Sequence, residues 1–187
     1  GITYSDEIAP SPADYGAMVK EAVGGLGCRL TFEPGRVIAG NAGILVVRVI
    51  YLKEGLAKQF CILDGAMNDL IRPTLYNAYH AIVPVRQAAE DTTETAMDLV
   101  GPICESGDYL AQDRMMPPLC AGDLLAVRTA GAYAAVMAST YNTRPLSPEV
   151  MVSGEQFSVV RRRLDVDEML ARESIPDWLD NDRKAAE

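Results

Sequence analysis

The pattern of hydrophobic and polar positions changes near residue 42 of the chain. Before that point, Ser11, Pro12 and Asp14 form a typical helix start, and two glycines at 24 and 25 end the helix, which predicts a helix over residues 11–24. The segment CRLTFE, residues 28–33, reads as a short strand closed by a Pro-Gly turn. A helix followed by a strand and a glycine turn is typical of a β/α unit.

Beyond residue 43 the chain consists mainly of apolar runs of strand length separated by Gly, Pro and Asp clusters. These runs predict an antiparallel β-barrel or sandwich. An amphipathic helix is expected to close the chain at about residues 165–172. The predicted strands are 44–53, 58–64, 80–85, 95–101, 123–129, 135–141, 149–154 and 157–163.

The domain organisation follows from this boundary. Residues 1–42 contain one predicted helix and one predicted strand, which is too little for a hydrophobic core of their own. Residues 43–187 are long enough to form a β-domain with a closing helix. We therefore expect the chain to be a piece of a longer protein, in which residues 1–42 are supported by other segments.

Composition excludes several classes of function. The chain has 187 residues, of which 49% are hydrophobic and 23% charged, so a sizeable core can form. Its net charge of −9 argues against a nucleic-acid partner, because phosphate binding relies on clustered Lys and Arg. No apolar run approaches the ~18 residues needed to span a bilayer, and the first residues do not resemble a signal peptide, so we expect a cytoplasmic protein.

The cysteines and the single histidine do not suggest a metal site. Cys28, Cys61, Cys104 and Cys120 form no CxxC pair, and His80 is the only histidine. We expect buried thiols in a reducing compartment, no bound metal, and a structural role for His80.

The turn FEPGR, residues 32–36, follows the first predicted strand. Gly35 lets the backbone approach an anion, and the guanidinium of Arg36 offers fixed donors to a phosphate or carboxylate. The alternative is a Pro-Gly turn with a surface ion pair.

The segment IRPTLY, residues 71–76, suits the first turn of a helix because Pro73 fits that position. Arg72 and Tyr76 are four residues apart, so one helical turn directs both side chains to one spot. A cation beside a phenol suits a carboxylate ligand, whereas the alternative is a helix cap with a packed tyrosine.

Cys104 and Glu105 follow a predicted strand and precede Ser-Gly-Asp, which places them on a loop. A thiol is a competent proton donor near neutral pH. The alternative for an isolated cysteine is a small buried hydrophobic residue.

Five motifs in this order resemble the diaminopimelate decarboxylases, a branch of the pyridoxal-phosphate enzymes with an alanine-racemase-like β/α barrel followed by a β-domain. The resemblance implies that residues 1–42 are the last unit or units of the TIM-type β/α barrel that binds pyridoxal 5'-phosphate. The motifs are FEPGR (32–36), DGAMNDLIRPTLY (64–76), GPICESGD (101–108), AGDLLAVRTAGAY (121–133) and YNTRP (141–145).

The resemblance also implies roles for single residues in the conversion of meso-diaminopimelate to L-lysine and CO2. Cys104 is the catalytic proton donor, and the family supplies it with Glu105 to the partner's cofactor in a homodimer with shared sites. The implied cofactor-binding residues are Glu33, Pro34, Gly35, Arg36 and Tyr133. The implied substrate-binding residues are Arg36, Arg72, Tyr76, Glu105 and Tyr133.

The lysines of this chain depart from the family pattern. None of the four lysines, Lys20, Lys53, Lys58 and Lys184, matches the motif of the lysine that carries the cofactor, so the fragment alone is expected to be inactive. An ornithine- or arginine-type decarboxylase is one alternative, but there the cysteine is typically followed by Asp. A non-catalytic dimerisation or regulatory module is the other.

Overall fold

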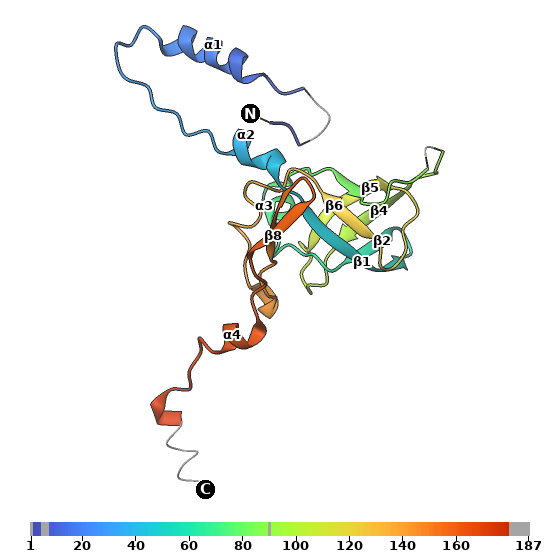
Figure 1. Ribbon diagram of the computed structural model, residues 1–187. Helices are drawn as coiled ribbons and strands as arrows, with labels where there is room; N and C mark the ends of the chain where they lie inside the picture. The colour runs from blue at the N-terminus through green and yellow to red at the C-terminus, as the bar shows by residue number, and fades with distance from the viewer. Residues whose placement is uncertain (1, 5–7, 90, 180–187) are drawn as a thin grey trace. The chain divides into compact units, whose positions relative to one another are not determined.

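The computed structural model describes residues 2–4, 8–89 and 91–179. The chain divides into two compact units, Gly1–Ala138 and Ser139–Glu187. The first unit contains the β-sheet at the centre of Figure 1.

Helix α1 spans Pro12–Val23 and confirms the predicted helix. Its first turn is fixed by a capping box, in which the Ser11 hydroxyl accepts from the Asp14 N–H and the Asp14 carboxylate accepts from the Ser11 N–H, both at 3.1 Å. The short helix α2, Arg36–Ala39, continues into the 3-10 helix η1, Gly40–Ala42. These two elements lead directly into the sheet.

Six strands form one sheet in the order β3-β6-β1-β2-β4-β5. Neighbours run antiparallel except β2 and β4, which are parallel. The edge strands are linked by Arg114 of β5, whose Nη1 donates to the carbonyl of His80, just before β3, at 2.9 Å. The strands are β1 Leu45–Glu54, β2 Gln59–Leu63, β3 Ile82–Pro84, β4 Thr95–Val100, β5 Tyr109–Met116 and β6 Leu124–Val127, and the helix α3, Arg72–Tyr76, follows β2. This nearly closed, barrel-like sheet confirms the predicted mainly β fold.

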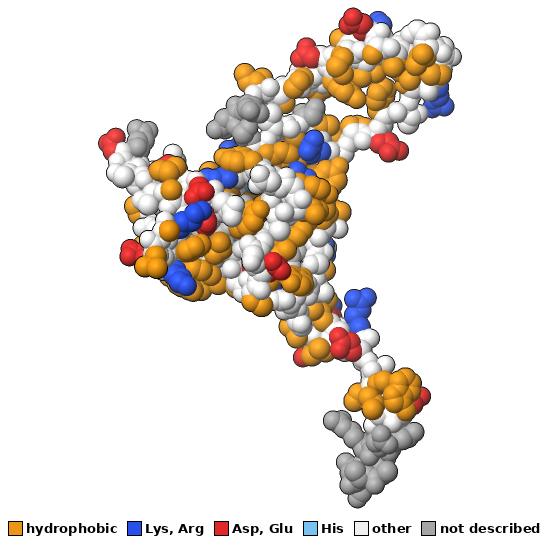
Figure 2. Space-filling view, turned by 180° about the vertical axis from the view of Figure 1, so that it is seen from behind, with side chains coloured by type: hydrophobic (Ala, Val, Ile, Leu, Met, Phe, Trp, Pro, Cys, Tyr) orange, Lys and Arg blue, Asp and Glu red, His pale blue; other side chains and the backbone are white. Residues whose placement is uncertain are grey.

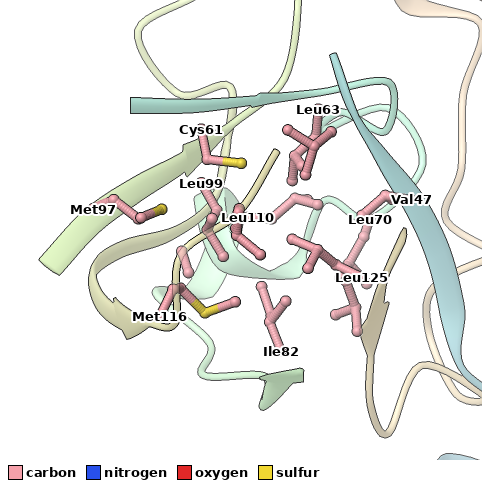
Figure 3. Packing of buried hydrophobic residues seen from close by; sticks show 14 of the residues in the cluster. Val47, Cys61, Leu63, Leu70, Ile82, Met97, Leu99, Leu110, Met116 and Leu125 are labelled. Carbon is pink, nitrogen blue, oxygen red and sulfur yellow. The ribbon is translucent and has the colours of Figure 1, made fainter. Parts of the chain in front are cut away.

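The hydrophobic core lies inside the curled sheet (Figure 3). Its side chains come from every strand of the sheet, including Met116 of β5 and Ile82 of β3. Cys61, Leu63, Leu70, Leu99 and Leu125 are fully buried there. Burial of such side chains stabilises each by about 1.5–3 kcal/mol relative to exposure.

The second unit contains a two-stranded antiparallel sheet and a closing helix. Strand β7 spans Glu149–Ser153, β8 spans Gln156–Arg161 and the 3-10 helix η2 spans Tyr141–Thr143. Helix α4, Val166–Leu170, confirms the predicted closing helix and begins with a capping box between Asp165 and Glu168.

The secondary structure differs from the sequence predictions in three places. Residues 28–33 do not form a strand, because no described segment pairs with them. Residues 135–141 form no strand: residues 135–137 lie in a turn, Tyr141 begins η2, and Val136 is 80% exposed. Strand β5 was not predicted at all.

The expectation of buried thiols is wrong for three cysteines. Only Cys61 is buried, whereas Cys28, Cys104 and Cys120 are exposed because they lie on loops outside the sheet. None of the helices in the described part of the chain is long and apolar enough to cross a bilayer. Among the same residues, no group of three or more His, Cys, Asp and Glu side chains is arranged to hold a metal ion.

Candidate functional site

Helix α3 brings Arg72 and Tyr76 together, as their spacing predicts. The Arg72 side chain is buried and its Cζ lies 5.9 Å from the centroid of the Tyr76 ring. Pro73 occupies the first turn, and Asn77 ends the helix in the left-handed region with φ 51°. One helical turn therefore places a cation beside a phenol.

Two more aromatic rings complete the surroundings of Arg72. Its Cζ lies 4.9 Å from the ring centroid of Tyr4 and 5.7 Å from that of Tyr133. The ring centroid of Tyr4 also lies 5.6 Å from the Cζ of Arg36. We call these five residues, Tyr4, Arg36, Arg72, Tyr76 and Tyr133, the arginine–tyrosine cluster.

A close contact between residues 40–43 and the turn after β6 holds the segment that carries Gly35 near Tyr133. The Ala130 N–H donates to the Gly43 carbonyl at 2.9 Å, and the Gly131 N–H donates to the Gly40 carbonyl at 3.0 Å. A Cβ atom on Gly131 would collide with the carbonyl oxygen of Ala39, so only glycine permits this approach.

The predicted cofactor turn lies next to the cluster. A Cβ atom on Gly35 would lie 3.8 Å from the Tyr133 hydroxyl. Glu33 and Pro34 are exposed and line a cavity of about 700 Å³ between α1 and residues 30–37. Figure 2 shows hydrophobic side chains gathered along this part of the chain. Glu33 forms no hydrogen bond or ion pair with the described residues.

Cys104 and Glu105 lie on the exposed loop between β4 and β5. The buried Asp108 carboxylate fixes this loop by accepting from the Ile103 N–H at 2.6 Å and from the Met67 N–H at 2.7 Å. The Thr74 hydroxyl of α3 donates to the Gly107 carbonyl. The loop is therefore held rigidly, although the thiol and the Glu105 carboxylate face solvent.

His80 is fully buried behind the cluster. Its Nδ1 lies 3.0 Å from the carbonyl oxygen of Arg128, and its ring packs edge to face against Tyr4 with centroids 4.8 Å apart. Burial is the main cause of its lowered pKa, with the positive charges of Arg72 and Arg114 adding to the effect and the Arg128 carbonyl opposing it.

The described lysines lie outside this cluster. Lys20 and Lys53 are exposed, and Lys58 pairs with Asp113 at 3.0 Å and with Asp98 at 3.2 Å. These carboxylates raise the pKa of Lys58 and keep its amine charged. Lys184 lies outside the described residues.

The cluster has the chemistry of an anion site. Among the described residues no carboxylate pairs with Arg72, and the Nε of Arg72 and the hydroxyl of Tyr4 are buried without a hydrogen-bond partner. Two guanidiniums and three phenols therefore offer donors that suit a phosphate or a carboxylate. This donor set fits a phosphorylated cofactor and an amino-acid substrate.

The structure brings five of the predicted site residues together: Gly35, Arg36, Arg72, Tyr76 and Tyr133. It places Cys104 and Glu105 on a separate loop. Sequence reasoning missed Tyr4 altogether and gave His80 no partner. The only available signal for Tyr4 was its place in the GITY segment, because its contacts join residues far apart in the chain.

Comparison with known proteins agrees with these observations. Residues 4–131 match the family of pyridoxal-dependent decarboxylases, C-terminal sheet domain. Diaminopimelate decarboxylase of Pseudomonas aeruginosa is 52% identical over 175 residues, which cover 94% of this chain and 41% of that protein. The protein of the same name from Zymomonas mobilis is 48% identical over 181 residues, covering 96% of this chain and 42% of the relative.

A crystal structure of diaminopimelate decarboxylase from Helicobacter pylori, complexed with L-lysine, has a similar fold. Its TM-score is 0.83 at 35% identity, covering 92% of this chain and 42% of that one. The chain thus spans about 42% of the length of such relatives. The motifs, the curled sheet and the family match agree, and we conclude that the chain belongs to the pyridoxal-dependent decarboxylases and contains their C-terminal sheet domain.

Proposed function

We propose that this chain is the C-terminal part of a cytoplasmic, homodimeric diaminopimelate decarboxylase that converts meso-diaminopimelate to L-lysine and CO2. The observation that carries the proposal is the buried guanidinium of Arg72, which is surrounded by three tyrosine rings and has no carboxylate partner among the described residues. A buried cation of this kind requires an anionic ligand. A substrate carboxylate meets that requirement.

The proposed roles of the cluster concern binding. Arg72 and Tyr76 bind a carboxylate of the substrate, and Arg36 reaches a carboxylate or the cofactor phosphate. Tyr133, whose hydroxyl lies near Gly35, would contact the phosphate end of the bound cofactor. Pro34 completes the turn, and Glu33 holds a proton at the ring nitrogen of the cofactor. When bound, pyridoxal phosphate supplies the electron sink for the broken carbon–carboxylate bond.

Cys104 and Glu105 are proposed to serve the site of the partner subunit. Both side chains are exposed on a loop that Asp108 holds in place, so they can reach a second protein surface. After CO2 leaves, the Cys104 thiol donates its proton to the same carbon, and the thiolate regains a proton from solvent. Glu105 binds the ammonium group at the far end of the substrate.

The charge of Glu105 also favours diaminopimelate over ornithine or arginine as the substrate. The distal end of diaminopimelate carries both an ammonium and a carboxylate, so its site needs both signs of charge. Arg36, Arg72 and Glu105 offer them.

A substrate comparison on the longer protein that contains this chain tests the proposal. With pyridoxal phosphate bound, meso-diaminopimelate should release CO2 and yield L-lysine, whereas ornithine and arginine should give at most ~1% of that rate, since an unpaired buried charge is costly. Faster turnover of ornithine or arginine would show that the protein is a different decarboxylase. Absence of turnover with all three would contradict the decarboxylase function itself.

A further inference from the structure

His80 is held from several sides at the start of β3. Its ring nitrogen faces the Arg128 carbonyl at 3.0 Å, and its own carbonyl accepts from Arg114 at 2.9 Å. The next residue, Ala81, accepts from the Arg128 N–H at 2.8 Å. Because these contacts belong to the sheet, the imidazole occupies a fixed position and can serve as a support for other groups.

The protonation state of this ring follows from its partner. A carbonyl oxygen only accepts hydrogen bonds, so Nδ1 carries the proton and donates it to Arg128. The lowered pKa of His80 keeps the ring neutral at neutral pH. Nε2 then carries a lone pair and is buried without a hydrogen-bond partner among the described residues. Its burial shields this nitrogen from substrate and argues against a direct chemical role.

Tyr4 connects this fixed ring to the arginine–tyrosine cluster. Its ring meets the His80 ring at an interplanar angle of 71° with centroids 4.8 Å apart, the favoured edge-to-face arrangement. The guanidiniums of Arg72 and Arg36 lie 4.9 Å and 5.6 Å from the same Tyr4 ring. The position of Tyr4 therefore affects both cations at once.

We propose that His80 is a positioning residue, whose ring fixes Tyr4 and through it the relative placement of the Arg36 and Arg72 guanidiniums. The inference rests on the proposed function in taking these arginines as the binding site for a substrate carboxylate. His80 sets the affinity for that carboxylate without touching it. Long, flexible arginine side chains lose less entropy on binding when their positions are fixed beforehand.

Nuclear magnetic resonance of the longer protein that contains this chain tests the first half of the inference. After ¹⁵N labelling of histidine, the ring signals of His80 are identified as those that disappear in His80→Asn. At neutral pH we expect a protonated Nδ1 and an unprotonated Nε2, and the Tyr4→Leu substitution should shift both ring signals. A proton on Nε2, or ring signals unchanged by Tyr4→Leu, would overturn the proposal.

Steady-state kinetics of the holoenzyme tests the second half. His80→Asn keeps an amide that can donate to the Arg128 carbonyl but removes the ring, and it should raise the KM for meso-diaminopimelate about tenfold with little change in kcat. Tyr4→Leu should do the same. The double variant should be no worse than either single variant, because both break the same chain of contacts. Tyr4→Phe, which keeps the ring but loses the hydroxyl donor, should raise KM less than Tyr4→Leu.

Lys58→Met is the matched control. Lys58 pairs with Asp98 of β4 and Asp113 of β5, outside the cluster. Its replacement should lower the melting temperature without raising KM. An unchanged KM in His80→Asn, or independent effects of His80→Asn and Tyr4→Leu that multiply, would refute the positioning role. An inactive wild-type holoenzyme would instead contradict the proposed function, while the resonance measurement still tests the contact between His80 and Tyr4.

Discussion

Cys61 and Cys104 differ in what their surroundings allow a thiol to do. Cys61 is fully buried in the core, where burial raises its pKa to about 12, so this thiol acts as a small hydrophobic side chain. Cys104 is exposed on a loop fixed by a buried carboxylate. Of these two thiols, only Cys104 can meet a substrate.

Replacing Cys104 with Ala in the holoenzyme should lower turnover by about 10²- to 10⁴-fold, the usual effect of removing a positioned acid. Cofactor binding, followed by its absorbance, should be unchanged because the exposed thiol supports no part of the core. Cys104→Ser should remain slow, since a hydroxyl is a much poorer acid. Cys120→Ala, which removes another exposed thiol, is the control. Full turnover of Cys104→Ser would show that another group supplies the proton.

His80 should make folding stability depend on pH. Its folded-state pKa is lowered, so the unfolded chain binds its proton first as the pH falls. The stability that the neutral ring contributes is complete above the unfolded pKa of about 6.5 and is lost as the pH falls toward the folded value. Urea unfolding from pH 7.5 to 5 should show a larger loss for the wild type than for His80→Gln. Parallel curves would contradict a buried, neutral His80.

Single residues could be predicted where chemistry and local spacing sufficed. The sequence singled out Arg36, Arg72 and Tyr133, and the structure places them together. The contacts of Tyr4 with His80 and Arg72 could not be predicted, because they depend on how Tyr4 lies against the start of β3.

Strand β5 shows why a regular element can escape prediction. A half-buried strand alternates inward and outward residues, but Leu110 and Ala111 of β5 are buried in succession. The register against β4 shifts between Met97 and Leu99, and Asp113 adopts φ 47° while its N–H donates to the Asp98 carboxylate at 2.7 Å. These irregularities disrupt the two-residue period on which the sequence prediction relies.

At residues 28–33 the opposite happens: the sequence predicts a strand that does not form. Its alternating Leu30 and Phe32 are typical of a strand, yet no described segment offers backbone partners for a ladder. The division of the chain at residue 42, with a barrel remnant before it, remains a prediction.

The loop that carries Cys104 should depend on Asp108. Replacing Asp108 with Ala leaves the buried N–H of Ile103 and the partly buried N–H of Met67 without their carboxylate, which should cost about 2–4 kcal/mol of unfolding free energy. Asp123→Ala is a suitable control, because that carboxylate accepts from the Cys120 N–H in an exposed turn, at 2.7 Å, where water can replace it. Urea unfolding measures both. Equal losses in the two variants would contradict the buried role of Asp108.

At the scale of the whole molecule, the proposed site has two separate parts. The arginine–tyrosine cluster lies where α2, α3 and the turn after β6 meet, whereas Cys104 and Glu105 lie on the loop after β4. A symmetric dimer can combine the cluster of one subunit with the loop of its partner. Each active site then needs residues from both chains.

A mixed dimer of the full-length protein provides the most direct test of this account. One subunit carries Arg72→Ala and the other Cys104→Ala, and two affinity tags allow the heterodimer to be purified. Each variant alone should release almost no CO2 from meso-diaminopimelate. The heterodimer contains one site with both native residues, so it should recover about half of the wild-type activity. A heterodimer as inactive as its parents, beside an active wild type, would contradict the shared site.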